Sequence, residues 1–159
     1  MLRITKVTDY GIEVLARMAR ENTQSSAADL AEAASLPLPI VSKVLKILGR
    51  EGVLLSHRGI KGGYTLSAPA EEITVSEVIG ALEGPIAMTE CTVFGDVECD
   101  HEDDCPVRAN WQIINQAVSK ALSGITLADM MRPSLGGNGA ENGDAAHLLN
   151  VLSMDEERV

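Results

Sequence analysis

One segment, residues 39–50, limits the possible folds most, because its apolar and basic residues fall on opposite faces of a helix. Pro39 suits the first helical position, where a missing N–H costs nothing. The apolar residues recur at i, i+3, i+4 and i+7 and are Val41, Val44, Leu45 and Leu48. The opposite face carries Ser42, Lys43, Lys46 and Arg50. Such a helix must bury one side in a core and expose a row of positive charge.

Two further helices are predicted before this one. Thr8 can cap the first helix. Its inward stripe is Tyr10, Val14, Leu15, Met18 and Ala19. Ser26 and Asp29 resemble a capping box, which starts a second helix that ends at about Ala34. A short turn, Leu36-Pro37-Leu38, leads into the basic helix. Two short helices joined by a tight turn, the second of them basic, match a helix-turn-helix whose second helix enters the DNA major groove.

A hairpin is predicted directly after the basic helix. Val53 to Ser56 and Tyr64 to Leu66 have the composition of paired strands. The connection is His57-Arg58-Gly59-Ile60-Lys61-Gly62-Gly63. Glycines such as Gly59 allow a close backbone approach, and Arg58 and Lys61 place charge at the tip. Any surface helix can turn Lys and Arg outward, but a basic helix followed by such a wing favours DNA binding, with Arg58 suited to a narrow minor groove.

The net charge of −10 conceals two opposed halves. Residues 1–63 hold nine Lys and Arg against six Asp and Glu, whereas residues 64–159 hold four against seventeen. This division suggests a basic contact module joined to an acidic sensing segment. No apolar run approaches the roughly 20 residues of a membrane span, and the first residues lack the apolar stretch of a signal peptide. We therefore expect a cytoplasmic protein without a membrane partner.

All three cysteines of the chain, Cys91, Cys99 and Cys105, fall in one acidic segment that contains no Lys or Arg. Their spacing lacks the paired C-x2-C knuckles of structural zinc sites. Three thiolates in one loop better suit an iron-sulfur cluster. Alternatives are a zinc site of three cysteines and His101, a thiol redox switch, or cysteines without a role, although a polar loop offers bystander thiols no apolar surroundings.

The segments after the hairpin are predicted to be helices, so we expect a mainly α protein. A fourth helix spans Val75 to Leu82, and a long helix runs from Pro106 to about Gly124. The apolar seam of the long helix, spaced for pairing between two subunits, is Val107, Trp111, Ile114, Val118, Ala121 and Ile125. Thr126 can cap a short helix that ends at about Met131. We expect a DNA-binding domain at 1–84, a cluster loop at 85–105, a dimerisation helix and a short terminal helix at 106–132, and a flexible tail at 133–159.

With these motifs assembled, residues 1–132 resemble the winged-helix transcription regulators that carry iron-sulfur clusters, the IscR, NsrR and RirA type. The matching segments are residues 2–6, Thr8-Asp9-Tyr10, residues 58–66, the three cysteines and residues 105–111. The resemblance implies a homodimeric repressor with a 2Fe-2S or 4Fe-4S cluster on the three cysteines of each subunit. It also implies control of iron-sulfur assembly genes, as in the SUF system, through a dyad-symmetric operator.

The same resemblance assigns residues. DNA contacts would come from Pro39, Ser42, Lys43 and Lys46 and from Arg58 in the wing. Some members have a histidine ligand three residues after the last cysteine, where this chain has Arg108. In others an acidic residue near the N-terminus reaches across the dimer, and Asp9 occupies a comparable place. Asp9 is thus the first candidate for the fourth ligand, ahead of His101 or a loop carboxylate.

Two rival functions remain open from the sequence. An enzyme would need a base, an oxyanion donor or a substrate pocket, and none of the three histidines stands in a recognisable catalytic motif. A winged helix that binds only proteins is the second rival, and the basic N-terminal half argues against it. We therefore expect a regulator and not an enzyme.

Overall fold

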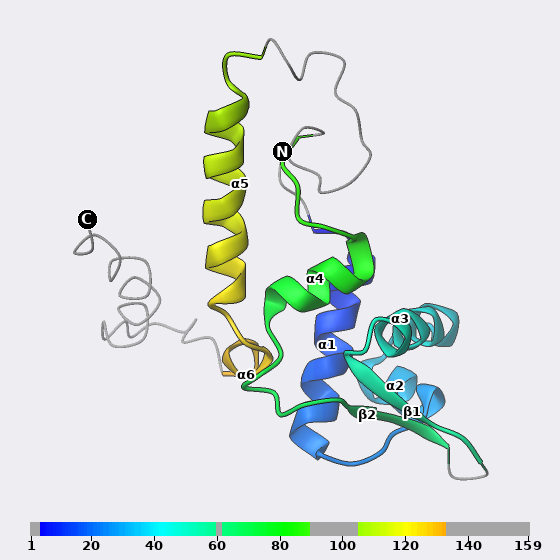
Figure 1. Ribbon diagram of the computed structural model, residues 1–159. Helices are drawn as coiled ribbons and strands as arrows, with labels where there is room; N and C mark the ends of the chain where they lie inside the picture. The colour runs from blue at the N-terminus through cyan, green and yellow to red at the C-terminus, as the bar shows by residue number, and fades with distance from the viewer. Residues whose placement is uncertain (1–3, 60–61, 90–104, 133–159) are drawn as a thin grey trace, which may run out of the picture.

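The computed structural model describes residues 4–59, 62–89 and 105–132. The helices are α1 (Lys6–Glu21), α2 (Ala27–Ala34), α3 (Leu38–Arg50), α4 (Val75–Glu83), α5 (Arg108–Ser123) and α6 (Leu127–Met130) (Figure 1). One antiparallel hairpin, β1 (Leu54–His57) and β2 (Gly63–Leu66), pairs Leu54 with Leu66 and His57 with Gly63. The mainly α, winged helix-turn-helix prediction is confirmed, with a long helix after the winged domain.

The start of α1 corrects one prediction. Thr5, not Thr8, is the N-cap, and its hydroxyl accepts a hydrogen bond from the Thr8 backbone N–H. Thr8 is instead fully buried, and its hydroxyl donates to the carboxylate of Glu83 at the end of α4. Both threonines can cap a helix in isolation, so only the distant partner distinguishes their roles.

Local signals for α2 and α3 are confirmed with small shifts. Ser26 and Asp29 form the predicted capping box, because each side chain accepts from the other residue's backbone N–H. Helix α3 starts one residue earlier than expected, so Pro39 occupies its second position and Leu38 its first. The first strand is also shifted by one residue, to Leu54–His57, and the long helix begins at Arg108 instead of Pro106.

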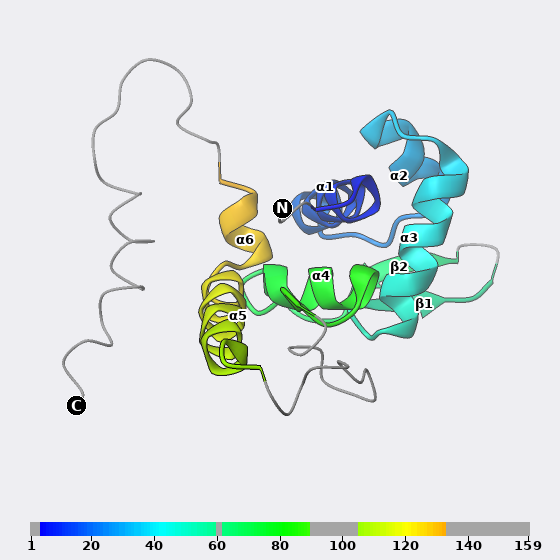
Figure 2. The ribbon, with the colours of Figure 1, turned by 90° about the horizontal axis from the view of Figure 1, so that it is seen from above.

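The core lies where α1, α3 and α4 meet, closed on one side by the hairpin (Figures 1 and 2). The apolar stripe of α3 is completely buried, and α1 contributes Val14, Leu15 and Met18. Tyr10, predicted in the α1 stripe, is only partly buried. Fully burying one such aliphatic side chain contributes about 1.5–3 kcal/mol, so these stripes fix the orientation of α3.

The hairpin is attached to the helical domain by backbone hydrogen bonds. Ser25 and Tyr64 exchange both N–H to O=C bonds, at 3.1 and 2.9 Å, which joins the α1–α2 connection to β2. Ser67 closes the other end of the hairpin, since its hydroxyl donates to the Val53 carbonyl at 2.9 Å. The wing therefore has a fixed position relative to α3.

Helices α5 and α6 extend from the winged domain and are tied to the start of α4. The Val75 N–H donates to the Ile125 carbonyl at 2.8 Å, and the Leu127 N–H donates to the Ile73 carbonyl at 2.7 Å. Helix α5 packs on α4 along one side only, and Asn115 is its one buried residue. Among the described helices, none is long and apolar enough to cross a membrane.

Candidate nucleic-acid interface and metal centre

The polar face of α3 points away from the core. Lys43, Lys46 and Arg50 are exposed, as is Pro39, and Ser42 is partly exposed. Complete burial of the opposite stripe forces this arrangement, since the two sets alternate around one helix. The exposed row has the chemistry for contacts with phosphates and base edges.

These cations differ in how they are held. The Arg50 Nε donates to the Glu51 carboxylate at 2.8 Å, in an exposed pair of little energetic weight. In the part of the chain that the structure describes, no carboxylate lies within ion-pair distance of Lys43, Lys46 or Arg58. Those three charges are therefore available to a polyanion without first breaking a described ion pair.

The wing tip depends on glycine. Gly59 has φ +114°, a conformation that side-chain-bearing residues rarely adopt. The Gly62 N–H donates to the Gly59 carbonyl at 2.9 Å, and a Cβ on Gly62 would lie 2.7 Å from the His57 carbonyl oxygen. This tight turn leaves Arg58 exposed beside Gly59. Lys61 lies outside the described residues.

A side-chain contact within the wing was not expected from the sequence. The His57 Nε2 and the Thr65 Oγ1 lie 2.9 Å apart across the two strands. An alternating strand pattern places these residues on one face, but it does not indicate that they pair. The contact braces the end of β1, directly before Arg58.

The described residues contain only part of the predicted metal centre. Cys91, Cys99 and His101 lie outside them, so Cys105 is the one cysteine of the three that the structure describes. Cys105 is a free, partly buried cysteine just before α5, and its carbonyl accepts from the Arg108 N–H at 3.3 Å. Asp9 is exposed in the first turn of α1, where a carboxylate is free to face a neighbouring subunit.

Three hydrogen bonds hold the chain that leads toward the cysteines, and the sequence predicts none of them. Glu83 accepts from the Thr5 N–H at 2.9 Å and from the Thr8 hydroxyl, which joins the end of α4 to the start of α1. Asn115 of α5 accepts from the Met88 N–H at 3.0 Å. Asp9 follows Thr8 directly, so the contact between Thr8 and Glu83 also fixes the first turn of α1, which carries this candidate ligand.

The Glu83 contact predicts a pH-dependent stability. Hydrogen bonds, chiefly from Thr8 and then from Thr5, lower the pKa of Glu83 below its ordinary value. A lowered folded-state pKa gives stability that is present above about pH 4.3 and is lost as pH falls through the folded pKa. Glu83→Gln should therefore flatten the fall in the urea midpoint between about pH 5 and pH 3.

A matched control uses an exposed glutamate. Glu71 lies on the surface between β2 and α4 and makes no described hydrogen bond through its side chain. Glu71→Gln should leave the wild-type pH dependence unchanged. If both variants have the wild-type profile, the Glu83 contact does not contribute to stability.

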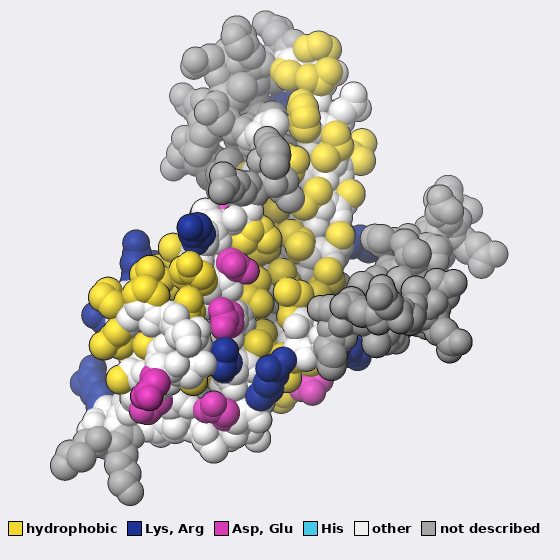
Figure 3. Space-filling model, turned by 180° about the vertical axis from the view of Figure 1, so that it is seen from behind, with side chains coloured by type: hydrophobic (Ala, Val, Ile, Leu, Met, Phe, Trp, Pro, Cys, Tyr) yellow, Lys and Arg dark blue, Asp and Glu magenta, His cyan; other side chains and the backbone are white. Residues whose placement is uncertain are grey.

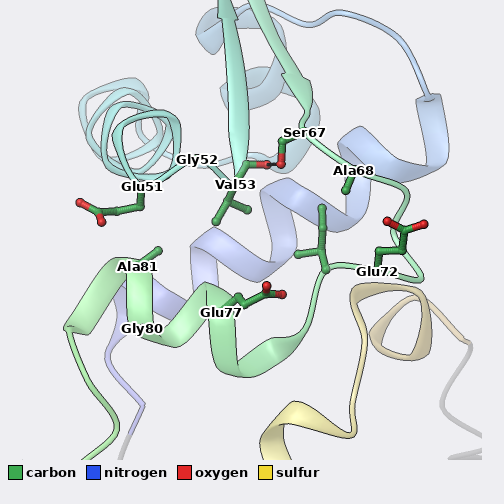
Figure 4. A pocket seen from close by; sticks show the side chains of 10 residues that line it. Glu51, Gly52, Val53, Ser67, Ala68, Glu72, Glu77, Gly80 and Ala81 are labelled. Carbon is green, nitrogen blue, oxygen red and sulfur yellow. Dashed lines mark hydrogen bonds between the residues drawn. The ribbon is translucent and has the colours of Figure 1, made fainter. Parts of the chain in front are cut away.

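Two hollows in the described surface bear on the enzyme alternative. One, of about 280 Å³, lies between the end of α3, the start of β1 and α4, and includes Glu51, Glu72 and Glu77 (Figure 4). Glu77 is engaged by the Thr74 cap, and Glu51 by Arg50. The other, of about 570 Å³, lies beside the end of α1 and β2. Neither described hollow is lined by a histidine, cysteine, lysine or arginine. The Ser67 hydroxyl, which lines both, donates its hydrogen bond to the Val53 carbonyl and not to a base.

Comparison with known proteins identifies the fold's family. The family model Rrf2, described as an iron-dependent transcriptional regulator, matches residues 4–133. The chain belongs to the Rrf2 family. Rrf2 members are transcription regulators and not enzymes, so the enzyme alternative is excluded and this protein is a DNA-binding regulator.

Individual relatives agree with this assignment. Protein aau3 of Rhizobium meliloti (strain 1021) is 31% identical over 82% of this chain and 86% of that protein. The regulator IscR of Vibrio atlanticus is 27% identical over 82% of this chain and 76% of its own. Among solved structures, CymR, described as the global cysteine regulator of B. subtilis, is similar with a TM-score of 0.62 and 28% identity, covering 82% of this chain and 97% of that one.

Proposed function

We propose that this Rrf2 regulator binds a dyad-symmetric operator as a homodimer and senses iron-sulfur status through a cluster on Cys91, Cys99 and Cys105. The observation that carries the DNA-binding part is the exposed cationic face of α3 beside a wing fixed to the same domain. Control of iron-sulfur assembly genes, as a repressor, is the most specific form of this proposal and is supported by the likeness to IscR.

Dimerisation is proposed to use α5. Two large apolar residues of this helix remain exposed, Ile113 at 65% and Ile114 at 43%, as does its N-cap Val107 at 46%. Apolar side chains form a strip along α5 in the view from behind (Figure 3). Trp111, Val118 and Ala121 of the predicted seam are partly covered in the single chain, so Val107 and Ile114 form the outer part of the seam. A second copy of α5 would cover that part and place two recognition helices on one duplex.

A salt series tests operator binding. Lys43, Lys46, Arg50, Arg58 and Lys61 occur twice in a dimer, and if all reached phosphate the slope of log affinity against log salt would be about −9. We expect roughly −4 to −7, because some of these side chains contact bases or stay solvated. Filter binding to a duplex selected from a randomised pool measures the slope. A slope near zero, or no selected sequence, would contradict DNA binding by this face.

Arg58 provides a second test, of how the wing contributes. Arg58→Ala should weaken operator binding by about 1 to 3 kcal/mol, with the loss concentrated on sites that have a narrow minor groove. Lys120→Ala on α5 is the control, since it removes one positive charge away from the wing and α3. Equal weakening by Arg58→Ala on all sequences would mean that Arg58 only contacts phosphate.

The residues fit the proposed cluster in donor chemistry. Thiolate sulfur is the ligand that iron-sulfur clusters prefer, and Cys105 is a free thiol. The exposed Asp9 supplies an oxygen ligand suited to one labile iron position. A bound cluster would supply a site of attack by oxygen or nitric oxide. The protein would hold the described chain on either side of the cysteine segment through the hydrogen bonds of Glu83 and Asn115.

A further inference from the structure

An apolar tip, Leu38 and Pro39, forms the beginning of the recognition helix. Leu38 is the first residue of α3 and is 46% exposed, although the helix's core-facing residues Val41, Val44, Leu45 and Leu48 are 0% exposed. Pro39 is also exposed. Isolated exposed leucines are common on protein surfaces, so the position of this one carries the argument.

The position is the end of the helix that reaches base edges. In a helix-turn-helix, residues at the N-terminus of the second helix contact the bases, and later residues approach the backbone. Leu38 lies one turn before Ser42 and at the edge of the face that carries Lys43 and Lys46. A duplex held by those cations would therefore meet Leu38 at the floor of the groove.

The side chains available there restrict what can be read. The first turn of α3 contains no acidic residue, and its cap, Pro37, makes no side-chain hydrogen bond. From Leu38 to Ser42 the segment has no arginine for guanine, no asparagine or glutamine for adenine and no carboxylate for cytosine. Its one hydrogen-bonding side chain is the Ser42 hydroxyl. The base-edge feature that an apolar side chain recognises is the C5-methyl group of thymine.

We propose that Leu38, with Pro39 beside it, reads thymine methyl groups in the major groove of each half-site. This inference rests on the proposed DNA-binding function and adds a specificity-determining residue to it. The contact is apolar, so it discriminates thymine from uracil as well as from the other bases. The cationic side chains of α3 and the wing hold the helix in the groove, and Leu38 selects the sequence there.

The experiment replaces thymine by uracil, one position at a time, in an operator selected by the full-length dimer. Uracil keeps every hydrogen-bonding group of thymine and lacks only the methyl. At one or two positions in each half-site, binding by the wild-type protein should weaken about fourfold, equivalent to about 0.8 kcal/mol for one buried methyl-sized group. Substituting both half-sites should weaken it roughly 15-fold if the two contacts are independent.

Variants then assign the methyl contact to Leu38. Leu38→Ala should bind the thymine operator more weakly and should not distinguish uracil at the same positions. Leu38→Gln, which keeps length and helix propensity, should do the same. Met130→Ala is the matched control, because Met130 is 47% exposed but lies on α6, away from α3 in both ribbon views (Figures 1 and 2). Met130→Ala should lose affinity for each uracil-substituted operator by the same factor as the wild-type protein.

The outcomes separate this inference from the proposed function. If no operator is selected, DNA binding itself fails. If an operator is bound but wild-type protein is indifferent to every uracil, methyl reading is overturned while DNA binding stands. If both Leu38 variants keep the wild-type sensitivity at the same positions, another residue makes the contact and the assignment to Leu38 is overturned.

Discussion

Protein prepared without oxygen is expected to be coloured and to contain iron and inorganic sulfide. Three thiolates in one short acidic segment of the sequence suit iron-sulfur ligation better than a zinc site without paired C-x2-C knuckles. Replacing any one of Cys91, Cys99 or Cys105 with alanine should abolish or severely destabilise the cluster while leaving a folded dimer. Metal and sulfide analysis, absorption and Mössbauer spectra, and the mass of the particle in solution measure these effects.

Controls for this result separate the competing metal sites. Stoichiometric zinc without sulfide, in protein never exposed to air, would contradict the cluster and favour the zinc alternative. In that case His101→Ala should lower the zinc content, whereas a cluster completed by Asp9 should be unaffected by it. Protein with neither metal nor sulfide but with a reversible thiol oxidation would favour the redox alternative.

The fourth ligand has its own measurable signature. Asp9→Ala should shorten the lifetime of the cluster in air, because one iron would lose its protein ligand. Glu13→Ala is the matched control, since Glu13 lies one turn further along α1 and pairs with Arg17 at 3.2 Å. An unchanged lifetime in Asp9→Ala would show that Asp9 is not the fourth ligand.

The sequence predicted those parts of the fold that depend on local patterns. The α3 stripe and the Ser26 capping box involve residues three to seven positions apart, and both are found as predicted. Thr8 was assigned wrongly because its partner, Glu83, is 75 residues away. The bond between Asn115 and Met88 was missed for the same reason.

The candidate site also has a part that local sequence patterns predict and a part that they do not. Exposure of Lys43, Lys46 and Arg50 follows from the periodicity of one helix, and the structure confirms that exposure. Their contacts with DNA stay predictions. The cysteine site could be anticipated from donor chemistry and resemblance, but two of its thiols fall outside the described residues. Leu38 is predicted in the turn before the basic helix, and only the structure gives its place as the first, exposed residue of α3.

Coupling between the cluster and DNA is the second large effect we expect. The described contacts offer a continuous path for it. Glu83 joins the end of α4 to α1, Asn115 joins the chain after α4 to α5, and α1 packs directly on α3. Loss of a cluster would leave thiolates and carboxylates close together, and their repulsion would alter the loop ends that these bonds hold.

Such coupling must act in both directions. If cluster loss changes operator affinity by some factor, operator binding must change cluster stability by the same factor. A factor of roughly 5 to 150 is ordinary for such coupling. Operator affinities of cluster-loaded and cluster-free dimers, measured at one salt concentration, give the first factor. Cluster binding with and without operator gives the second.

A variant can locate the path as well as test the coupling. Glu83→Gln should bring the two operator affinities closer together, because the joint between α4 and α1 is weakened while the DNA-contacting residues are untouched. Glu71→Gln should leave the factor at its wild-type value. Equal affinities of the two wild-type forms on every selected operator would leave the cluster without a regulatory role. If Glu83→Gln keeps the wild-type ratio between the operator affinities of the cluster-loaded and cluster-free dimers, the cluster still regulates DNA binding. The coupling would then pass through the α5 dimer contact and not through Glu83.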